Sequence, residues 1–318
     1  MNRRALLKLG VNRIGHAQSA DRFPSQAVRI VVATLPGTVM DVSSRAVGKY
    51  LEPRWKQPLV TLNIAGAGGA IGADTVARAA PDGHTLLLGH EGIVAIAPLL
   101  ADRLARGPRP DLRPVVNVTE TDVVLVVGRN GGIQSLGDLI SRARARPEKL
   151  TYGSPGVGTP VHLRMEIFMR EANIRLLHVP YKGGAAALAD VLGGQVDCTM
   201  VSASVAAPYA ADKLRVLAVS GRQRNALFPD VATFSDTLPN VAFTTWFGLF
   251  APSETPRELV NLIARDISEA VRSPELGATF LKAGINPVGG TPEDLERVVQ
   301  ADFAAYSRLF QQKDFKPT

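Results

Sequence analysis

A regular alternation of β-branched runs with amphipathic stretches begins near residue 28 and continues along most of the chain. Such alternation is typical of βαβ units, in which a helix connects two parallel strands. The first part is predicted to hold strands at 28–33, 58–64 and 84–88, and helices at 41–55 and 70–80. The middle part is predicted to hold strands at 150–152, 176–179, 197–201 and 214–219, and helices at 160–172, 185–192 and 204–211. The pattern therefore predicts an α/β protein built on mostly parallel sheet.

Two longer β-rich segments, 115–127 and 243–251, interrupt this alternation. The first is too long for one ordinary strand and has polar residues in its middle, at 119–122. A chain that leaves one lobe, builds a second and comes back would need two such crossing strands. We therefore predict a two-lobed α/β fold, with domain 1 formed by residues 23–120 and 245–318 and domain 2 by residues 121–244. A cleft between two hinged lobes is a usual place for a small ligand.

Capping residues mark several helix starts. Ser135 with Asp138 at the third helical position predicts one start. Thr255 and Thr291 each precede a proline, and an acidic residue follows at the third helical position. We expect two helices, beginning after these two threonines, to finish the chain.

Composition excludes several classes of function. The chain has 318 residues, of which 46% are hydrophobic, enough for two cores. The net charge is +7, and four of the positive charges precede the first acidic residue, Asp21. The basic run from Arg142 to Lys149 has no aromatic residues between its charges. We therefore expect no nucleic-acid binding. Cys198 is the only cysteine and no two histidines lie four apart, which argues against a disulfide and a metal site. The sequence contains no run of about 18 apolar residues, so we expect no membrane-spanning helix.

Residues 1–22 resemble a shortened or atypical export signal. Arg3 and Arg4 precede a short apolar run, and small residues suited to cleavage follow at 17–20. Lys8 and Arg13 interrupt the apolar part. The segment predicts a periplasmic location.

A glycine-rich loop, Gly66 to Gly72, follows the second predicted strand and opens a helix. The loop is similar to a dinucleotide-binding fingerprint. Tyr209 and Lys213 form a Tyr-x-x-x-Lys pair, as short-chain dehydrogenases have. An NAD(P)-dependent, short-chain-dehydrogenase-like oxidoreductase is therefore the alternative function. Against it, the fingerprint belongs after the first strand, and no aspartate follows the third strand where a ribose partner is expected. The loop is otherwise either a tight turn with close helix packing or a cleft loop that contacts a ligand through Gly68.

A second loop, Ser154 to His162, also runs from a strand into a helix. Its backbone N–H groups, the hydroxyls of Ser154 and Thr159 and the helix start predict an anion site without any cation. Thr159 is expected to cap the helix ahead of Pro160. The loops at 35–41 and 179–184 follow the same logic, and Asp41 either caps its helix or receives a ligand ammonium. No Gly-x-Ser-x-Gly motif is present, which excludes a serine hydrolase of that kind.

Eight segments in order make the chain, from about Phe23 to the C-terminus, resemble the Bug-type solute receptors, the extracytoplasmic binding components of tripartite tricarboxylate transporters. The segments are 28–41, 66–74, 80–87, 152–162, 178–184, 192–197, 246–252 and 287–293. The resemblance implies a type II periplasmic-binding-protein fold that closes on a small carboxylate, held mainly by backbone amides, hydroxyls and ordered water. It also implies a non-enzymatic function without a cofactor, as a monomer that delivers its ligand to membrane permease subunits; a sensor without a transport role is a further possibility.

The resemblance places ligand contacts in the loops from Pro36 to Asp41 and from Ser154 to His162, with Tyr181 to Gly184 and Asp197 lining or supporting the cleft. With Gly68 and Glu91 added, the predicted ligand-binding residues are Pro36, Gly37, Thr38, Val39, Asp41, Gly68, Glu91, Ser154, Gly156, Gly158, Thr159, His162, Tyr181, Gly183 and Asp197. Two departures from the family pattern stand out. The first loop usually reads Pro-Pro-Gly-Gly, whereas Leu35 and Thr38 replace its outer residues here. Glu91 stands where the family usually has a small or polar residue, and in a cleft it would oppose a carboxylate or attract the amino group of an acidic amino acid.

Overall fold

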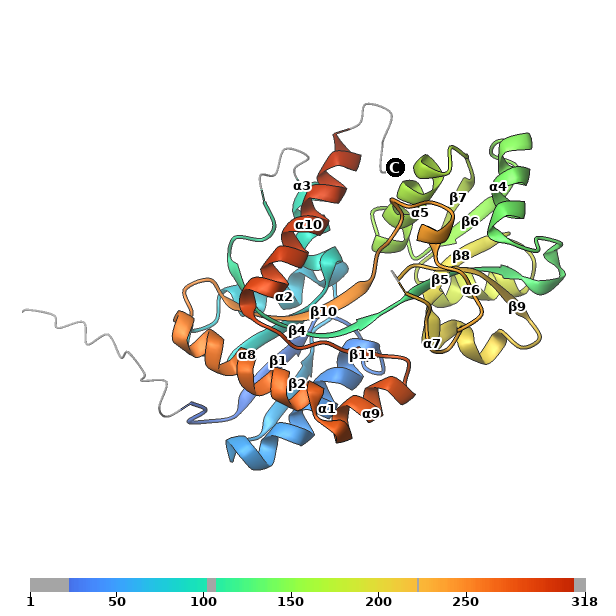
Figure 1. The fold of residues 1–318 in the computed structure, drawn as a ribbon. Helices are drawn as coiled ribbons and strands as arrows, with labels where there is room; N and C mark the ends of the chain where they lie inside the picture. Colours follow the sequence, from blue (N-terminus) through green and yellow to red (C-terminus); the bar gives the residue numbers. More distant parts are fainter. Residues whose placement is uncertain (1–22, 102–106, 222, 312–318) are drawn as a thin grey trace, which may run out of the picture.

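The computed structural model describes residues 23–101, 107–221 and 223–311, so the export-signal prediction lies outside the described residues. Within them the strands form two separate sheets, one of six strands and one of five. Figure 1 shows the two sheets with their helices as two lobes joined by extended chain. The predicted two-lobed α/β fold is confirmed.

The first sheet has the order β11-β4-β10-β3-β1-β2. Its strands are β1 (Val28–Val32), β2 (Leu59–Asn63), β3 (Thr85–Gly89), β4 (Leu112–Thr121), β10 (Thr245–Pro252) and β11 (Asn286–Pro287). One face is covered by α1 (Val39–Trp55), α8 (Arg257–Arg272) and α9 (Pro274–Lys282), and the other by α2 (Ala70–Ala77) and α10 (Pro292–Phe310). Apolar side chains of each strand alternate between the two faces, so Ile30 and Leu86 pack under α1 and α8 while Val31 and Leu87 pack under α2 and α10.

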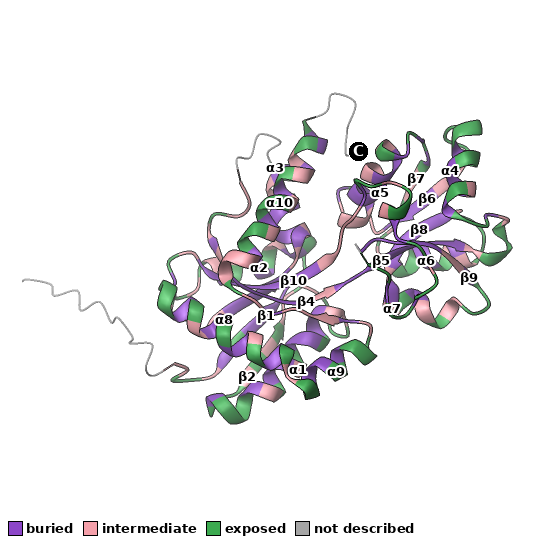
Figure 2. Ribbon diagram, viewed as in Figure 1, coloured by how far each residue is buried: buried purple, intermediate pink, exposed green. Residues whose placement is uncertain are grey.

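The second sheet has the order β7-β6-β8-β5-β9. Its strands are β5 (Val123–Gly128), β6 (Thr151–Ser154), β7 (Leu177–Pro180), β8 (Cys198–Ser202) and β9 (Leu214–Val219). One core lies under α4 (Leu136–Ala145) and α5 (Pro160–Glu171), and the other under α6 (Gly184–Leu192) and α7 (Ala203–Ala206). Short helical turns complete the described chain: η2 (Ala67–Gly69), η3 (Gly92–Ile96), α3 (Ala97–Ala101), η4 (Arg129–Gly131), η5 (Ala207–Tyr209) and η6 (Phe234–Asp236). Figure 2 shows both sheets as buried layers between helices with exposed outer faces.

The long β-rich segment does cross between the lobes, as predicted. It divides at Asp122 into β4 of the first sheet and β5 of the second. The prediction of mostly parallel sheet is wrong for these crossing strands: β10 runs antiparallel to β4 and β3, and β5 runs antiparallel to β8 and β9. For β4 and β10 the reason is geometric, because a chain that leaves a lobe and returns beside its own exit must travel in the opposite direction.

The end of the chain corrects a second prediction. Three helices follow β10 in the described residues, because α9 begins at Pro274 behind its own cap, Ser273. Thr291 forms the predicted capping box with Asp294. Thr255 does not cap α8, which has Pro256 at its N-cap position. The Thr255 hydroxyl is buried and has no hydrogen-bond partner in the described structure.

The two threonines therefore make a matched pair of variants. We expect Thr291→Ala to lower the free energy of unfolding by about 1 kcal/mol, because the helix start loses its capping hydroxyl. Thr255→Val keeps the side-chain shape and removes an unpartnered hydroxyl, so its unfolding free energy should be unchanged or higher. Urea unfolding of both variants measures the difference, and a loss for Thr255→Val as large as that for Thr291→Ala would contradict the assignment.

Candidate ligand-binding site

A cavity of about 750 Å³ lies between the lobes. The first lobe lines it with the start of α1, the segment after β3 and part of β10, and the second lobe lines it with the start of α5, with α6, with α7 and with β8. The volume falls in the range of small-molecule sites. Of the predicted ligand-binding residues, four line this cavity: Thr38, Val39, Glu91 and Thr159.

The start of α1 faces the cavity with unused backbone donors. Thr38 occupies the N-cap position and its hydroxyl accepts a hydrogen bond from the Asp41 N–H at 3.4 Å. The N–H groups of Val39 and Met40 make no hydrogen bond that the described structure contains, as expected for the first turn of a helix. The Asp41 carboxylate is already bonded, to Gly37 N–H at 3.0 Å and to Arg45 Nε at 3.0 Å, and Arg45 is the main reason that its pKa is lowered. Asp41 therefore has a capping role and does not line the cavity.

The start of α5 faces the same cavity from the other lobe. Thr159 is at the N-cap position, but its hydroxyl donates to the Gly156 carbonyl at 2.7 Å, so the expected side-chain cap is absent there. His162 caps the turn in its place, because its Nδ1 accepts from the Gly158 N–H at 3.0 Å. Burial lowers the pKa of His162 to about 4, which keeps the ring neutral and able to accept. Pro160 has no backbone N–H, so Val161 supplies the backbone N–H group of the first turn of α5 that lines the cavity.

A buried ion pair joins the lobes at the cavity. Arg164 on α5 donates through Nη2 to Glu91 Oε1 at 2.5 Å, and Arg164 is 2% exposed while Glu91 is 0% exposed. Arg164 also donates to the Thr244 carbonyl at 3.0 Å and to Thr245 Oγ1 at 2.7 Å, on the strand that returns to the first lobe. Burial raises the pKa of Glu91, and the charge of Arg164 acts against that rise. The Glu91 carboxylate therefore pairs with the Arg164 guanidinium. From the sequence we expected it either to oppose a ligand carboxylate or to attract a ligand amine.

Arg164 is a cavity-lining residue that sequence reasoning missed. Arg164 lies four residues after Pro160, so both residues lie on one face of α5. This spacing could have placed Arg164 on the same side of the helix as the predicted anion-binding loop. The neighbouring His90 also lines the cavity, and burial, with a smaller contribution from Arg164, lowers the pKa of its ring to about 4. His90 is therefore uncharged at neutral pH.

The other predicted contacts hold loops in place and do not line the cavity. Asp197 accepts from the Thr151 N–H at 2.7 Å and the Thr151 hydroxyl at 2.8 Å. Tyr181 donates to Asp190 at 2.6 Å. Ser154 pairs with His178 Nε2 at 2.7 Å, and the His178 ring stacks on that of His162 at 4.3 Å. The remaining residues outside the lining are Pro36, Gly37, Gly68, Gly156, Gly158 and Gly183.

The glycine-rich loop of the oxidoreductase alternative does not line the cavity either. Gly72 lets α2 approach the sheet, since a Cβ there would lie 2.9 Å from the Ile64 carbonyl. Gly69 has φ of 96° and a Cβ there would meet Ile93 at 2.7 Å, so this loop is a close-packed turn. Tyr209 lines the cavity from the other lobe, but its partner in the motif, Lys213, does not. The two parts of the dehydrogenase pattern thus do not meet at this site.

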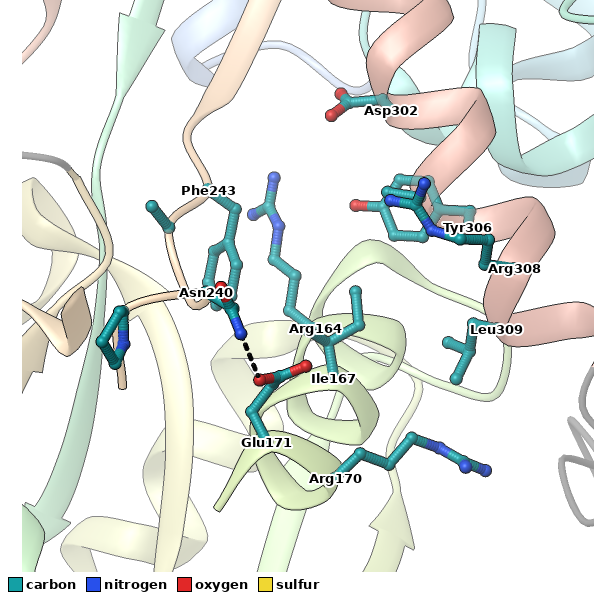
Figure 3. A pocket seen from close by; sticks show the side chains of 13 residues that line it. Arg164, Ile167, Arg170, Glu171, Asn240, Phe243, Asp302, Tyr306, Arg308 and Leu309 are labelled. Atoms are coloured by element: carbon teal, nitrogen blue, oxygen red, sulfur yellow. Dashed lines mark hydrogen bonds between the residues drawn. The ribbon is translucent and has the colours of Figure 1, made fainter. Parts of the chain in front are cut away.

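A second cavity, of about 720 Å³, lies on the other side of Arg164, between α5, the segment 239–243 and α10. Figure 3 shows Arg164 between Phe243 and Asp302, with Tyr306 and Arg308 on α10. The Arg164 guanidinium lies over the Phe243 ring at 5.3 Å. Asp302 accepts from Trp246 Nε1 at 2.6 Å, and burial, with a smaller contribution from the charge of Glu91, raises its pKa to about 6.

The described residues contain no group of His, Cys, Asp and Glu side chains able to hold a metal ion. The same residues include no helix long and apolar enough to cross a membrane.

Two lobes that close around a cavity with helix starts on both sides define a two-lobed solute-binding protein. Residues 43–315 match the family described as "Tripartite tricarboxylate transporter family receptor", and the chain belongs to this family. Protein BugT of Bordetella pertussis is 31% identical over 301 residues, which cover 94% of this chain and 92% of BugT. The predicted Bug-type resemblance is therefore confirmed.

Solved structures of similar proteins agree with this assignment. The R. palustris protein Rpa4515, solved with adipate, is 30% identical with a TM-score of 0.79, covering 90% of this chain and 96% of that chain. MatC from Rhodopseudomonas palustris, solved with bound malate, is 28% identical with a TM-score of 0.76, covering 91% of this chain and all of that chain.

The ion pair makes a clear stability prediction. Arg164→Met should lower the free energy of unfolding by about 3–5 kcal/mol at pH 8, because Glu91 stays buried without its cation. The loss should shrink as the pH falls, since a carboxyl with a raised folded pKa binds its proton more tightly in the folded state. The double variant Glu91→Gln/Arg164→Met should recover most of the loss in urea unfolding, and equal losses in the single and double variants would contradict the pairing.

Asp302 predicts a separate pH dependence. Its pKa of about 6, against 3.8 for the free side chain, means that the folded protein loses stability as the pH rises from about 4 to about 7. Asp302→Asn keeps an acceptor for Trp246 and removes the ionisation, so it should be more stable than the wild type by about 3 kcal/mol at pH 8. Urea midpoints at several pH values measure this gap, which should close near pH 4; parallel pH profiles would argue against a buried, titrating Asp302.

Proposed function

We propose that this chain is a periplasmic receptor that binds an organic carboxylate between its lobes without changing it chemically. The observation that carries the proposal is the meeting of two helix starts, α1 and α5, from different lobes at one cavity. A helix start stabilises a nearby anion by roughly 0.3–1 kcal/mol, and more where it is partly buried. Both contributions are available to a ligand only when the lobes are close together, so binding favours the closed form.

The predicted contacts that line the cavity fit this function. Val39 and Val161 bring backbone N–H groups, and Arg164 brings a guanidinium already shared with Glu91. The hydroxyls of Thr38 and Thr159 hold the two turns in place by donating to the carbonyls of Leu35 and Gly156. An acidic amino acid would in addition need a carboxylate for its ammonium group. Asp41 is bonded to Arg45, and Glu91 to Arg164, so a carboxylate without an amino group fits better.

The division of the chain follows from the same geometry. Residues 23–120 with 245–318 form the first lobe and residues 121–244 the second in this proposal, because β4 gives way to β5 at Asp122 and β10 begins at Thr245. The hinge then consists of two neighbouring segments, with Arg164 bonded to one of them.

Family membership supports delivery of the ligand to the permease of a tripartite tricarboxylate transporter. Adipate and malate in the similar proteins Rpa4515 and MatC support a carboxylate as the ligand class. The oxidoreductase alternative has no comparable support, since its glycine loop and its Tyr-x-x-x-Lys pair do not meet at one site.

Ligand binding to the full chain tests the proposal. Thermal-shift and calorimetric screens against mono-, di- and tricarboxylates should find at least one acid that binds. At a concentration of about 100 times its dissociation constant such a ligand adds about 2.7 kcal/mol of stability. Failure of every acid to bind would overturn the proposal, as would tight binding of NAD(P)H.

A matched pair of variants tests the helix start. Val39→Pro removes one N–H at the first position of α1, where proline is tolerated and the extended backbone of Thr38 is compatible with it. Val39→Ala keeps that N–H. We expect Val39→Pro to weaken the binding of the best acid about tenfold beyond any effect of Val39→Ala, equivalent to about 1.4 kcal/mol, by calorimetry. Equal affinities of the two variants would argue against the helix start as an anion contact.

A further inference from the structure

The wall that the second lobe gives to the cavity is apolar. Its side chains come from three neighbouring elements, α6, β8 and α7. They are Ala185, Leu188, Leu192, Met200, Val201 and Val205. Apolar surface of this kind gains from covering an apolar ligand body, whereas a charged group placed against it loses hydration without a partner.

The charged groups of the lining are few and already matched. Among the described residues of the lining they are Glu91 and Arg164, which bond to each other at 2.5 Å. The pair carries no net charge. The remaining groups suited to an anion are backbone N–H groups at the starts of α1, α5 and α6, together with the hydroxyls of Ser202 and Tyr209. One carboxylate therefore finds donors, and a second one has no cation of its own.

We infer that the ligand of this receptor is a monocarboxylate with an apolar body. The carboxylate lies at the helix starts, and the apolar body lies along the wall formed by α6, β8 and α7. This inference rests on the proposed function, of which it specifies the ligand class. It separates this chain from the similar proteins solved with adipate and malate.

Pairs of acids matched in length test the inference on the full chain. Octanoate should bind at least tenfold more tightly than suberate, which has the same number of carbons and a second carboxylate. Affinity should rise about fourfold per methylene from butanoate to octanoate, because each buried methylene contributes about 0.8 kcal/mol. Isothermal titration calorimetry at one pH and ionic strength measures all of these affinities.

A charge placed on the apolar wall tests its position. Val205 lines the cavity and is 46% exposed, so Val205→Lys adds a cation without disturbing a packed core. We expect this variant to change the ratio of suberate to octanoate affinity at least tenfold in favour of suberate. Val60→Lys is the matched control, since Val60 is 40% exposed on β2 and does not line the cavity.

The outcomes separate the inference from the proposed function. Tighter binding of suberate or citrate than of octanoate by the wild type would overturn the inference and leave a carboxylate receptor. Equal ratios in Val205→Lys and Val60→Lys would overturn the placement of the apolar body. If no acid binds, or if 1-octanol binds as well as octanoate, the proposed function itself fails.

Discussion

The antiparallel pairing of β10 with β4 is the constraint on which the two-lobed form depends. It runs from Thr245 opposite Thr121 to Pro252 opposite Leu112, so the returning strand lies beside the departing strand along its whole length. The two connections between the lobes are thereby held next to each other, at Asp122 and Thr245. Adjacent connections allow one lobe to rotate toward the other, which is the motion that a closing receptor needs.

Arg164 links this hinge to the cavity. It bonds to the return strand at Thr244 and Thr245, and to Glu91 of the other lobe. Taking two charges out of water is costly, and their mutual attraction offsets this cost only while they remain in contact. Because Glu91 and Arg164 belong to different lobes, their attraction favours the arrangement in which the lobes are in contact. A ligand that contacts both lobes favours the same arrangement.

Sequence reasoning predicted what depends on local pattern. The helix start at Thr291, the crossing at Asp122 and the loops before α1 and α5 follow from capping residues and from runs of β-branched residues. The antiparallel strands and the Glu91–Arg164 pair depend on which distant segments meet, and the pair spans 73 residues. The sequence also left open whether Asp197 and Tyr181 line the cleft or support it, and both bond within their own lobe. A pattern of residue types does not tell a side chain that contacts a ligand from one that supports a loop.

Thr38 departs from the family pattern without straining the first loop. Gly37 has φ of 83°, which favours glycine, whereas Thr38 has φ of −76° and fits a residue with a side chain. The Thr38 hydroxyl also bonds to that of Thr34 at 2.8 Å, and both residues line the cavity. Replacement of a glycine at this position therefore adds a hydroxyl and a methyl group to the site without straining the turn. Such a change reshapes the cavity and leaves the helix start available to an anion.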